Sequence, residues 1–181
     1  MSEVRFSITT PLRIDLVPVP GTAGLIGMTF CPGKKDIGLG GFWDRDLATD
    51  LQVIRGWGCS ALVTLMEPHE LKLLQVPHLP ALVLRLGMEW HHLPIRDVDY
   101  PDRLFERLWE ESGRRLRRSL AAGGRIVFHC RGGIGRTGTI AARLLTEFGV
   151  SPKQAIRMVR TARPGTIETL LQEAYVMRLI R

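Results

Sequence analysis

Cysteine is scarce in this 181-residue chain, which has only Cys31, Cys59 and Cys130. An odd number of cysteines, with no Cys-x2-Cys pair, argues against both a disulfide framework and a structural zinc site. We therefore expect a reducing, cytoplasmic compartment. The opening residues, MSEVRFSITTPLRIDL, lack the apolar segment of a secretory signal. No apolar run approaches the ~20 residues that cross a bilayer.

Acidic residues and lysines are both few compared with arginines. Lysine and arginine number 25 against 18 aspartates and glutamates, which gives a net charge of +7, and only four of the 25 are lysines. Guanidinium groups suit bidentate capture of phosphate, so the surplus favours a phosphorylated substrate, a nucleic acid or a membrane surface. A solvated basic surface explains the charge equally well. We interpret the arginines at 114–118 as a solvated helix face and expect no nucleic-acid partner.

The length predicts a single domain over residues 1–181, with residues 1–9 as a flexible N-terminal extension. Residues 31–41 (CPGKKDIGLGG) have the composition of a loop. Short apolar runs predict strands over 12–17, 25–30, 61–65, 89–95 and 125–129. Helical periodicity predicts helices over 44–56, weakly before 86, from 101, and over 137–148, 152–160 and 167–180. This alternation favours an α/β fold with a central, mostly parallel twisted sheet of about five strands flanked by helices.

The residues that follow the strand at 125–129 carry the clearest chemical signal. Cys130 falls at the carboxyl end of that strand, where open α/β sheets bind ligands. Glycine permits backbone N–H groups to turn toward one anion, and the next helix points its positive end at the same place. The same field favours a thiolate. The sequence thus predicts a sulfur nucleophile beneath a phosphate cradle made of Arg131, Gly132, Gly133, Ile134, Gly135 and Arg136.

Two other interpretations of this segment are disfavoured. A nucleotide-binding P-loop requires Gly-Lys-Ser/Thr, which is absent at the required spacing. A buried structural cysteine before a glycine turn would not need the arginine at 136, whose planar fork suits two phosphate oxygens.

The segment HCRGGIGRT resembles the signature Cys-x5-Arg-Ser/Thr of the cysteine-dependent protein tyrosine phosphatases. The segments TPLRIDL, FCPGKKD, HHLPIRD and RPGTIETLLQEAY resemble the dual-specificity branch related to kinase-associated phosphatase. The resemblance extends over nearly the whole chain from about residue 10. It implies a phosphatase fold and a two-step hydrolysis. In this reaction, the Cys130 thiolate attacks phosphorus, and an aspartic acid protonates the leaving oxygen and then activates water.

The general acid must come from a loop that reaches the cradle, because a phenol or alcohol leaves poorly as its anion. Asp97 matches the Pro-Ile-x-Asp segment of the family, so the resemblance assigns it this role. Asp99 stays open as the alternative, although it also fits turn chemistry. Asp102 is explained by its place in the first turn of the following helix.

The resemblance also assigns supporting roles. Thr137 matches a hydroxyl that hydrogen-bonds the sulfur, although a helix-start role remains open. His129 matches the histidine that fixes the loop rather than acting as a base. Gln172 matches a glutamine that positions water in some relatives. We interpret Lys34 and Lys35 as solvated, unless their loop lies near the cleft.

We therefore expect a phosphomonoester hydrolase that acts on a phosphorylated protein or peptide, phosphotyrosine above all, without a metal or other cofactor. A phosphoinositide or inositol-phosphate phosphatase remains an alternative, although Ile134 stands where such relatives often carry a cation. A phosphopeptide-binding pseudophosphatase and a rhodanese-like sulfur transferase are also open. The intact Cys130, Arg136 and Asp97 disfavour the pseudophosphatase, and Asp97 with Arg136 and Thr137 disfavours sulfur transfer. A kinase partner is implied by the resemblance alone.

Overall fold

Five apolar segments pair into the central sheet of the computed structural model, which describes residues 4–38 and 41–179. The strands are β2 (Asp15–Pro18), β3 (Leu25–Phe30), β6 (Ala61–Thr64), β7 (Glu89–His92) and β8 (Arg125–Cys130). Their order is β2-β3-β8-β6-β7, and only the β2–β3 pair is antiparallel. The expected mostly parallel sheet of about five strands is confirmed.

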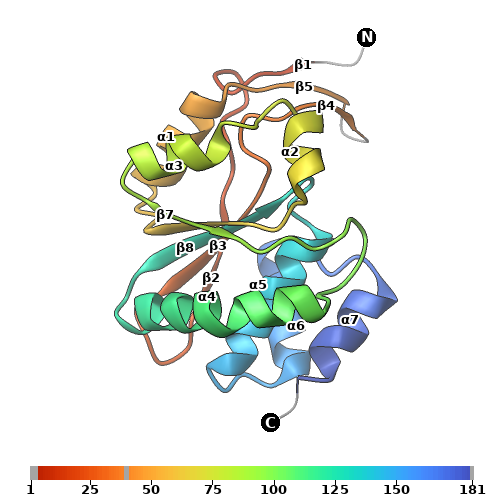
Figure 1. Ribbon diagram of the computed structural model, residues 1–181. Helices are drawn as coiled ribbons and strands as arrows, with labels where there is room; N and C mark the ends of the chain where they lie inside the picture. The colour runs from red at the N-terminus through yellow and green to blue at the C-terminus, as the bar shows by residue number, and fades with distance from the viewer. Residues whose placement is uncertain (1–3, 39–40, 180–181) are drawn as a thin grey trace.

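Helices cover both faces of this sheet (Figure 1). They are α1 (Leu47–Gly56), α2 (Pro68–Leu73), α3 (Leu79–Arg85), α4 (Arg103–Ala121), α5 (Gly135–Glu147), α6 (Pro152–Ala162) and α7 (Leu170–Met177). The first three helices lie on one side of the sheet, and the last four lie on the other (Figure 1). The single-domain α/β fold is therefore confirmed.

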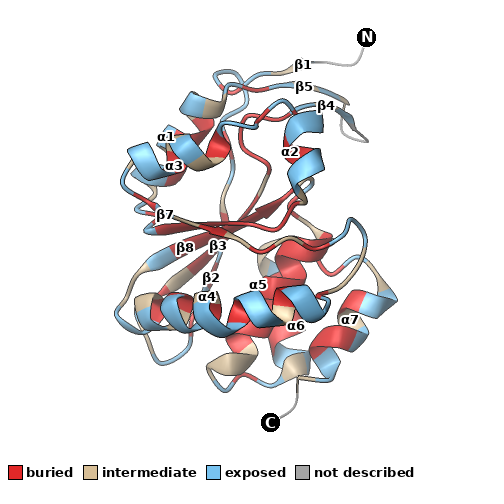
Figure 2. Ribbon diagram, viewed as in Figure 1, coloured by how far each residue is buried: buried red, intermediate tan, exposed pale blue. Residues whose placement is uncertain are grey.

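The strand–turn–helix unit β8–α5 lies at the centre of the molecule. β8 is paired on both edges, and its residues 126–130 are buried. Helix α5 is buried from Gly135 to Leu145 (Figure 2). A parallel strand covered on both faces needs a continuous apolar run, which explains why Ile126, Val127 and Phe128 follow one another. The turn between β8 and α5 is therefore held by the most buried part of the protein.

A second, small sheet corrects the sequence interpretation. Residues 31–41 are not simply a loop, because β4 (Lys35–Gly38) pairs antiparallel with β5 (Gly41–Asp44), while residues 39–40 lie outside the described residues. β1 (Val4–Arg5) pairs parallel with β5. Val4 and Arg5, from the segment predicted as a flexible N-terminal extension, therefore belong to this sheet. The β1–β5 pairing joins segments distant in sequence, which local composition does not reveal. β4 and β5 instead form a local hairpin, whose glycine-rich sequence also suits a loop.

Helix boundaries also shifted, because side chains cap helices at positions that periodicity alone does not reveal. α1 begins at Leu47, since Asp46 accepts a hydrogen bond from the Thr49 amide at 2.7 Å. Asp102 likewise caps α4 through the Phe105 amide at 2.9 Å. The last helix begins at Leu170 rather than at 167 and ends at Met177, and Ile180 lies outside the described residues.

A buried ion pair joins the small sheet to the main domain. Arg45, just after β5, donates to both Asp50 carboxylate oxygens at 2.8 Å, and both side chains are fully buried. Arg45 also donates to the Thr10 carbonyl at 2.9 Å, while the Gly33 amide donates to Asp50 at 2.8 Å. This pair therefore fixes three backbone segments that surround β4 and β5.

We predict that Asp50→Ala destabilises the protein by about 3–5 kcal/mol, because it leaves the buried Arg45 cation without a counterion. Denaturant unfolding followed by circular dichroism would measure this loss. Asp44→Ala is the matched control, since it breaks the Lys35–Asp44 pair, whose members are about half exposed. An exposed pair contributes about 0–1 kcal/mol. Equal losses for the two variants would contradict the importance of the buried pair.

Candidate active site

The phosphate loop, residues 130–136, connects the end of β8 to the start of α5. Cys130 is 3% exposed, and the Gly133 amide donates to its Sγ atom at 3.2 Å. Ile134 is the N-cap residue of α5, so the positive end of this buried helix faces the loop. The backbone therefore places amide donors and a helix N-terminus around one thiol, as an anion-binding cradle requires.

Glycine occupies three positions of the loop, and the structural constraint differs from one position to the next. Gly133 has a φ of 69°, and a Cβ atom there would overlap the Thr29 backbone. A Cβ atom at Gly135 would overlap the Glu168 carboxylate. Gly132 has no such constraint, because the nearest atom to a Cβ would be 3.9 Å away on Ile134. Glycine is thus required at 133 by conformation and packing, whereas a Cβ atom at 135 would require side-chain ends, including the exposed Glu168 carboxylate, to shift.

Arg136 is the buried cation of the site, with a 2% exposed side chain. Its guanidinium donates to the two Glu70 carboxylate oxygens at 2.6 and 2.9 Å and to the Ile95 carbonyl at 3.1 Å. It also donates to Asp97 Oδ1 at 2.8 Å. Burial alone would lower the pKa of Arg136, but the hydrogen bonds to Glu70 and the nearby acidic groups raise it above its usual value. Arg136 therefore stays charged.

Glu70 is a functional candidate that the sequence analysis missed. It is 5% exposed and lies on α2, which follows β6, the parallel neighbour of β8. Burial would raise its pKa, but the hydrogen bonds and charge of Arg136 lower it, so the carboxylate is ionised. A signal was present: an acidic residue soon after a buried strand lies at the same edge of a parallel sheet as the other ligands.

Asp97 lies where the sequence predicted an acid, on the segment 95–101 after β7. Its side chain is 51% exposed, and its Oδ1 atom accepts hydrogen bonds from Arg136 and from the Val98 amide at 3.1 Å. Val98 has a φ of 62°, which is uncommon for a branched residue. Asp99 makes the same kind of turn contact, since it accepts from the Tyr100 amide at 2.8 Å. Of these acids, Asp97 is the one that contacts Arg136.

Gln172 connects helix α7 to the acid-bearing segment. Its amide nitrogen donates to the Asp99 carbonyl at 3.0 Å, and its Oε1 atom accepts from the Glu168 amide at 3.0 Å. The side chain is fully buried. These contacts tie Gln172 to the segment that carries Asp97, and its amide also lies close to Gly135 of the phosphate loop.

His129 and Thr137 are buried on either side of the phosphate loop. Burial, together with the charges of Arg136 and His92, lowers the pKa of His129 to about 3, so the imidazole is neutral. His129 Nε2 lies 2.8 Å from Thr64 Oγ1, which accepts from Trp90 Nε1 at 2.9 Å. The Thr137 hydroxyl finds no hydrogen-bond partner in the described part of the chain and does not cap α5.

Two basic side chains near the loop differ from expectation. Arg131 directs its guanidinium to Asp36 on β4, at 2.8 and 3.0 Å, so it offers its backbone rather than its charge to the cradle. Lys34, expected to be solvated, is 5% exposed and lies over the Trp43 ring at 4.2 Å. Burial lowers the pKa of Lys34, opposed by the nearby Asp36 carboxylate.

The geometry brings Cys130, Arg136 and Asp97 together at one edge of the central sheet. Within residues 4–38 and 41–179, no group of three or more His, Cys, Asp or Glu side chains is arranged to hold a metal ion. In that same part of the chain, no helix combines the length and apolar character needed to cross a bilayer.

A family model described as "Polymorphic toxin system, DSP-PTPase phosphatase" matches residues 37–150. Cyclin-dependent kinase inhibitor 3 of Rattus norvegicus is 30% identical over 174 residues, which cover 92% of this chain and 78% of the relative. The chain therefore belongs to the family of dual-specificity and tyrosine phosphatases, as the sequence resemblance indicated.

Solved structures agree with this assignment. Kinase-associated phosphatase, crystallised with its catalytic-site cysteine replaced by serine, superposes with a TM-score of 0.82 at 28% identity, covering 92% of this chain and 93% of that one. Tk-PTP in the active form gives a TM-score of 0.66 at 25% identity, with coverages of 92% and 98%. Both matches extend far beyond the signature loop, so the whole domain is that of a phosphatase.

We predict that iodoacetate labels Cys130 before the other two cysteines at about pH 6. Burial raises the pKa of Cys59 to about 12 and raises that of Cys31 further, so both thiols stay protonated until the pH is far higher. Cys130 instead receives an amide hydrogen bond in a loop suited to anions. Peptide mass mapping would measure the order of labelling.

Phosphate or vanadate should protect Cys130 from iodoacetate, because each would occupy the same cradle. Cys130→Ser is the control, and it should leave the protein unlabelled at this pH. Comparable labelling of all three cysteines in the folded wild type would contradict the prediction.

Proposed function

We propose that this phosphatase domain hydrolyses phosphomonoesters on proteins or peptides, phosphotyrosine above all, through a cysteinyl-phosphate intermediate. The observation that carries the proposal is the convergence of Cys130, the Gly133 amide, Arg136 and Asp97 at one sheet edge. A thiol nucleophile, amide donors, a bidentate cation and an acid are the groups that phosphoryl transfer requires.

In the first step, Cys130 Sγ attacks phosphorus while the P–O bond to the leaving group breaks. The amides of the phosphate loop and the Arg136 guanidinium bind the three non-bridging oxygens, on which negative charge resides. Asp97, in its acid form, donates its proton to the departing oxygen. The products of this step are the dephosphorylated hydroxyl, a cysteinyl-phosphate and the Asp97 carboxylate.

In the second step, the Asp97 carboxylate takes a proton from water as the water oxygen attacks phosphorus and the S–P bond breaks. The unpartnered Thr137 hydroxyl is available to donate a hydrogen bond to the departing sulfur. His129 is neutral, buried and hydrogen-bonded to Thr64 on β6, which disfavours a role as a base and supports one in fixing the residue that precedes the nucleophile. Inorganic phosphate leaves, and both Cys130 and Asp97 return to their starting forms.

The Asp97–Arg136 contact fixes the position of Asp97 before substrate binds. A phosphate group that binds Arg136 competes for the same guanidinium nitrogen, NH2, that now contacts Asp97. Asp97 would then be released toward the leaving oxygen and take up a proton from solvent before it acts as the acid, and the exposure of its side chain allows both changes. Glu70 keeps its two hydrogen bonds to Arg136 and maintains the orientation of the cation.

A phosphoprotein substrate is favoured over a phosphoinositide because Arg131, the cation next to the nucleophile, is bound to Asp36 instead of facing the cradle. The relationship to cyclin-dependent kinase inhibitor 3 and kinase-associated phosphatase supports a kinase as a candidate partner. A reducing, cytoplasmic setting fits three unpaired cysteines, one of which must remain a thiol to act.

The first experiment is turnover of para-nitrophenyl phosphate and a tyrosine phosphopeptide by the wild type and Cys130→Ser. Cys130→Ser should lose essentially all activity while still binding phosphate, because the serine hydroxyl is a far weaker nucleophile. A wild type that binds phosphopeptide without turnover would instead be a pseudophosphatase. A phosphoinositide is assayed as a third substrate, and its preferred turnover would favour the lipid alternative.

We predict that Asp97→Asn lowers kcat for para-nitrophenyl phosphate by roughly 10²–10⁴-fold, the usual contribution of a general acid. The loss should shrink for substrates with more acidic leaving groups, because these need less protonation. The basic limb of the pH–rate profile, where the acid loses its proton, should flatten. Steady-state kinetics over a series of aryl phosphates would measure these effects.

Asp99→Asn is the matched control, since the same chemical change occurs two residues away on a side chain that only forms a turn. It should change kcat far less and keep the basic limb. A large, leaving-group-dependent loss in Asp99→Asn but not in Asp97→Asn would reverse the assignment.

A further inference from the structure

Basic side chains from outside the phosphate loop hold three consecutive carbonyl groups of that loop. Lys34 Nζ donates to the Arg131 carbonyl at 3.2 Å. Arg163, at the end of α6, donates to the Gly132 carbonyl at 3.1 Å and to the Gly133 carbonyl at 2.6 Å. None of these contacts involves the side chains that make the cradle.

The direction of these carbonyls determines where the amide groups point. In a trans peptide, the C=O of one residue and the N–H of the next point in opposite directions. Holding the carbonyls of residues 131–133 outward therefore turns the amides of Gly132, Gly133 and Ile134 inward. The Gly132–Gly133 peptide illustrates this: Arg163 binds its carbonyl, and its N–H reaches Cys130 Sγ.

Arg163 is itself fixed, which makes it a rigid support. Its third nitrogen donates to Asp15 Oδ2 on β2 at 2.6 Å, and the two side chains are 15% and 8% exposed. Lys34 Nζ lies over the contacting rings of Phe30 and Trp43, at 5.2 and 4.2 Å from their centroids. The Arg131 carbonyl additionally accepts from the Cys31 amide at 3.4 Å, so Lys34 supports a peptide that already has a partner.

We propose that Arg163, with Lys34 in a lesser role, forms an outer clamp that orients the phosphate-loop amides toward the substrate phosphate without touching the substrate. Hydrogen bonds from cations to the carbonyls also polarise these peptides, which strengthens their N–H groups as donors. This inference rests on the proposed phosphatase function. It assigns Arg163 and Lys34 as positioning residues and Asp15 as the anchor of Arg163.

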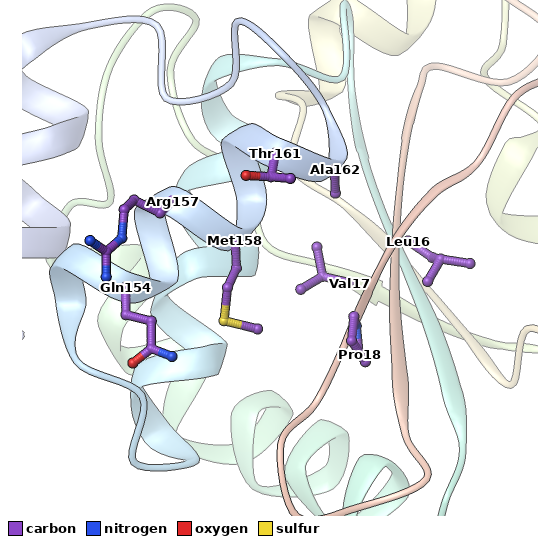
Figure 3. A pocket seen from close by; sticks show the side chains of 8 residues that line it. All are labelled: Leu16, Val17, Pro18, Gln154, Arg157, Met158, Thr161 and Ala162. Atoms are coloured by element: carbon purple, nitrogen blue, oxygen red, sulfur yellow. The ribbon is translucent and has the colours of Figure 1, made fainter.

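A groove beside the clamp supplies a matched control residue. It has a volume of about 620 Å³ and is lined by residues of β2 and α6 (Figure 3). Leu16 and Ala162, the neighbours of Asp15 and Arg163, are among them. Arg157 also lines the groove, but it is exposed and extends from α6 without contacting the phosphate loop. Arg157→Gln therefore makes the same charge change on the same helix outside the clamp.

The test compares Arg163→Gln, Arg163→Lys and Lys34→Met with the wild type and Arg157→Gln. We expect Arg163→Gln to raise both the vanadate inhibition constant and KM by roughly tenfold or more, and to lower kcat, because misdirected amides bind phosphate oxygens less well. Arg163→Lys keeps the charge but has one nitrogen for three acceptors, so its effect should be intermediate. Lys34→Met should have the smallest effect, because the Cys31 amide remains.

A purely structural role gives a different pattern. Partial unfolding would lower kcat through the fraction of folded enzyme and leave the vanadate inhibition constant and KM unchanged. The rate of Cys130 alkylation by iodoacetate at about pH 6 is a further readout, and it should fall in Arg163→Gln because fewer amides stabilise the thiolate. Arg143→Gln, which removes a buried guanidinium paired with Glu106 and Glu147, should lower thermal stability without changing the inhibition constant.

Folded Arg163→Gln with a vanadate inhibition constant within twofold of wild type would overturn the clamp while leaving the proposed function intact. A folded wild type that neither turns over aryl phosphates nor binds vanadate would overturn the proposed function, and the clamp with it. If Arg163→Gln fails to fold, Asp15→Asn replaces it. This variant weakens the anchor of Arg163 and also the pair that Asp15 makes with Arg13, whose side chain is exposed and lies outside the clamp. A smaller rise in the same constant is then expected, and no rise would overturn the clamp.

Discussion

The buried charge of Arg136 is the constraint around which the site is organised. A cation that has left water must be paired and hydrogen-bonded, otherwise its desolvation costs several kcal/mol. Glu70 supplies two acceptor oxygens from α2, and the Ile95 carbonyl and Asp97 supply two more from the segment after β7. The guanidinium thereby joins elements that follow three neighbouring parallel strands. Its need for partners fixes the acid-bearing segment relative to the nucleophile.

The phosphate loop presents the opposite electrostatic problem, because its amides must remain available for an anion. The rest of the domain leaves the amides available because it binds the carbonyl groups of the same peptides. Arg163, anchored by Asp15, and Lys34 bind these carbonyls from outside the loop. Gly133, which adopts a left-handed φ against the Thr29 backbone, permits the sharp turn that this arrangement needs. Buried cations therefore lie on both sides of the loop, and in the proposed mechanism Arg136 is the one that binds the substrate phosphate.

Much of the fold was predictable, because most of its elements carry a strong local signal. The buried strand β8 reads as a continuous apolar run, and the helices over 152–162 and 103–121 follow their periodicity and first-turn residues. The local hairpin of β4 and β5 was missed because its glycines also suit a loop, and β1 was missed because it pairs with a segment distant in sequence. Lys34 was expected to be solvated unless its loop lay near the cleft, and the folded chain places it beside the phosphate loop and over the Phe30 and Trp43 rings.

The sequence by itself determined the family, the cradle and its candidate nucleophile. These features reside in one short contiguous segment, where the spacing of residues largely dictates how their atoms are arranged. A cysteine, five residues and an arginine between a strand and a helix leave few conformations open. Only the tertiary structure decided which carboxylate holds Arg136, which acid reaches it and which cations turn the loop. Glu70, Asp97 and Arg163 come from different elements, and their meeting depends on strand order and helix packing. These long-range contacts form because folding buries charged groups and apolar surface from distant elements together. The local spacing of residues therefore cannot predict them.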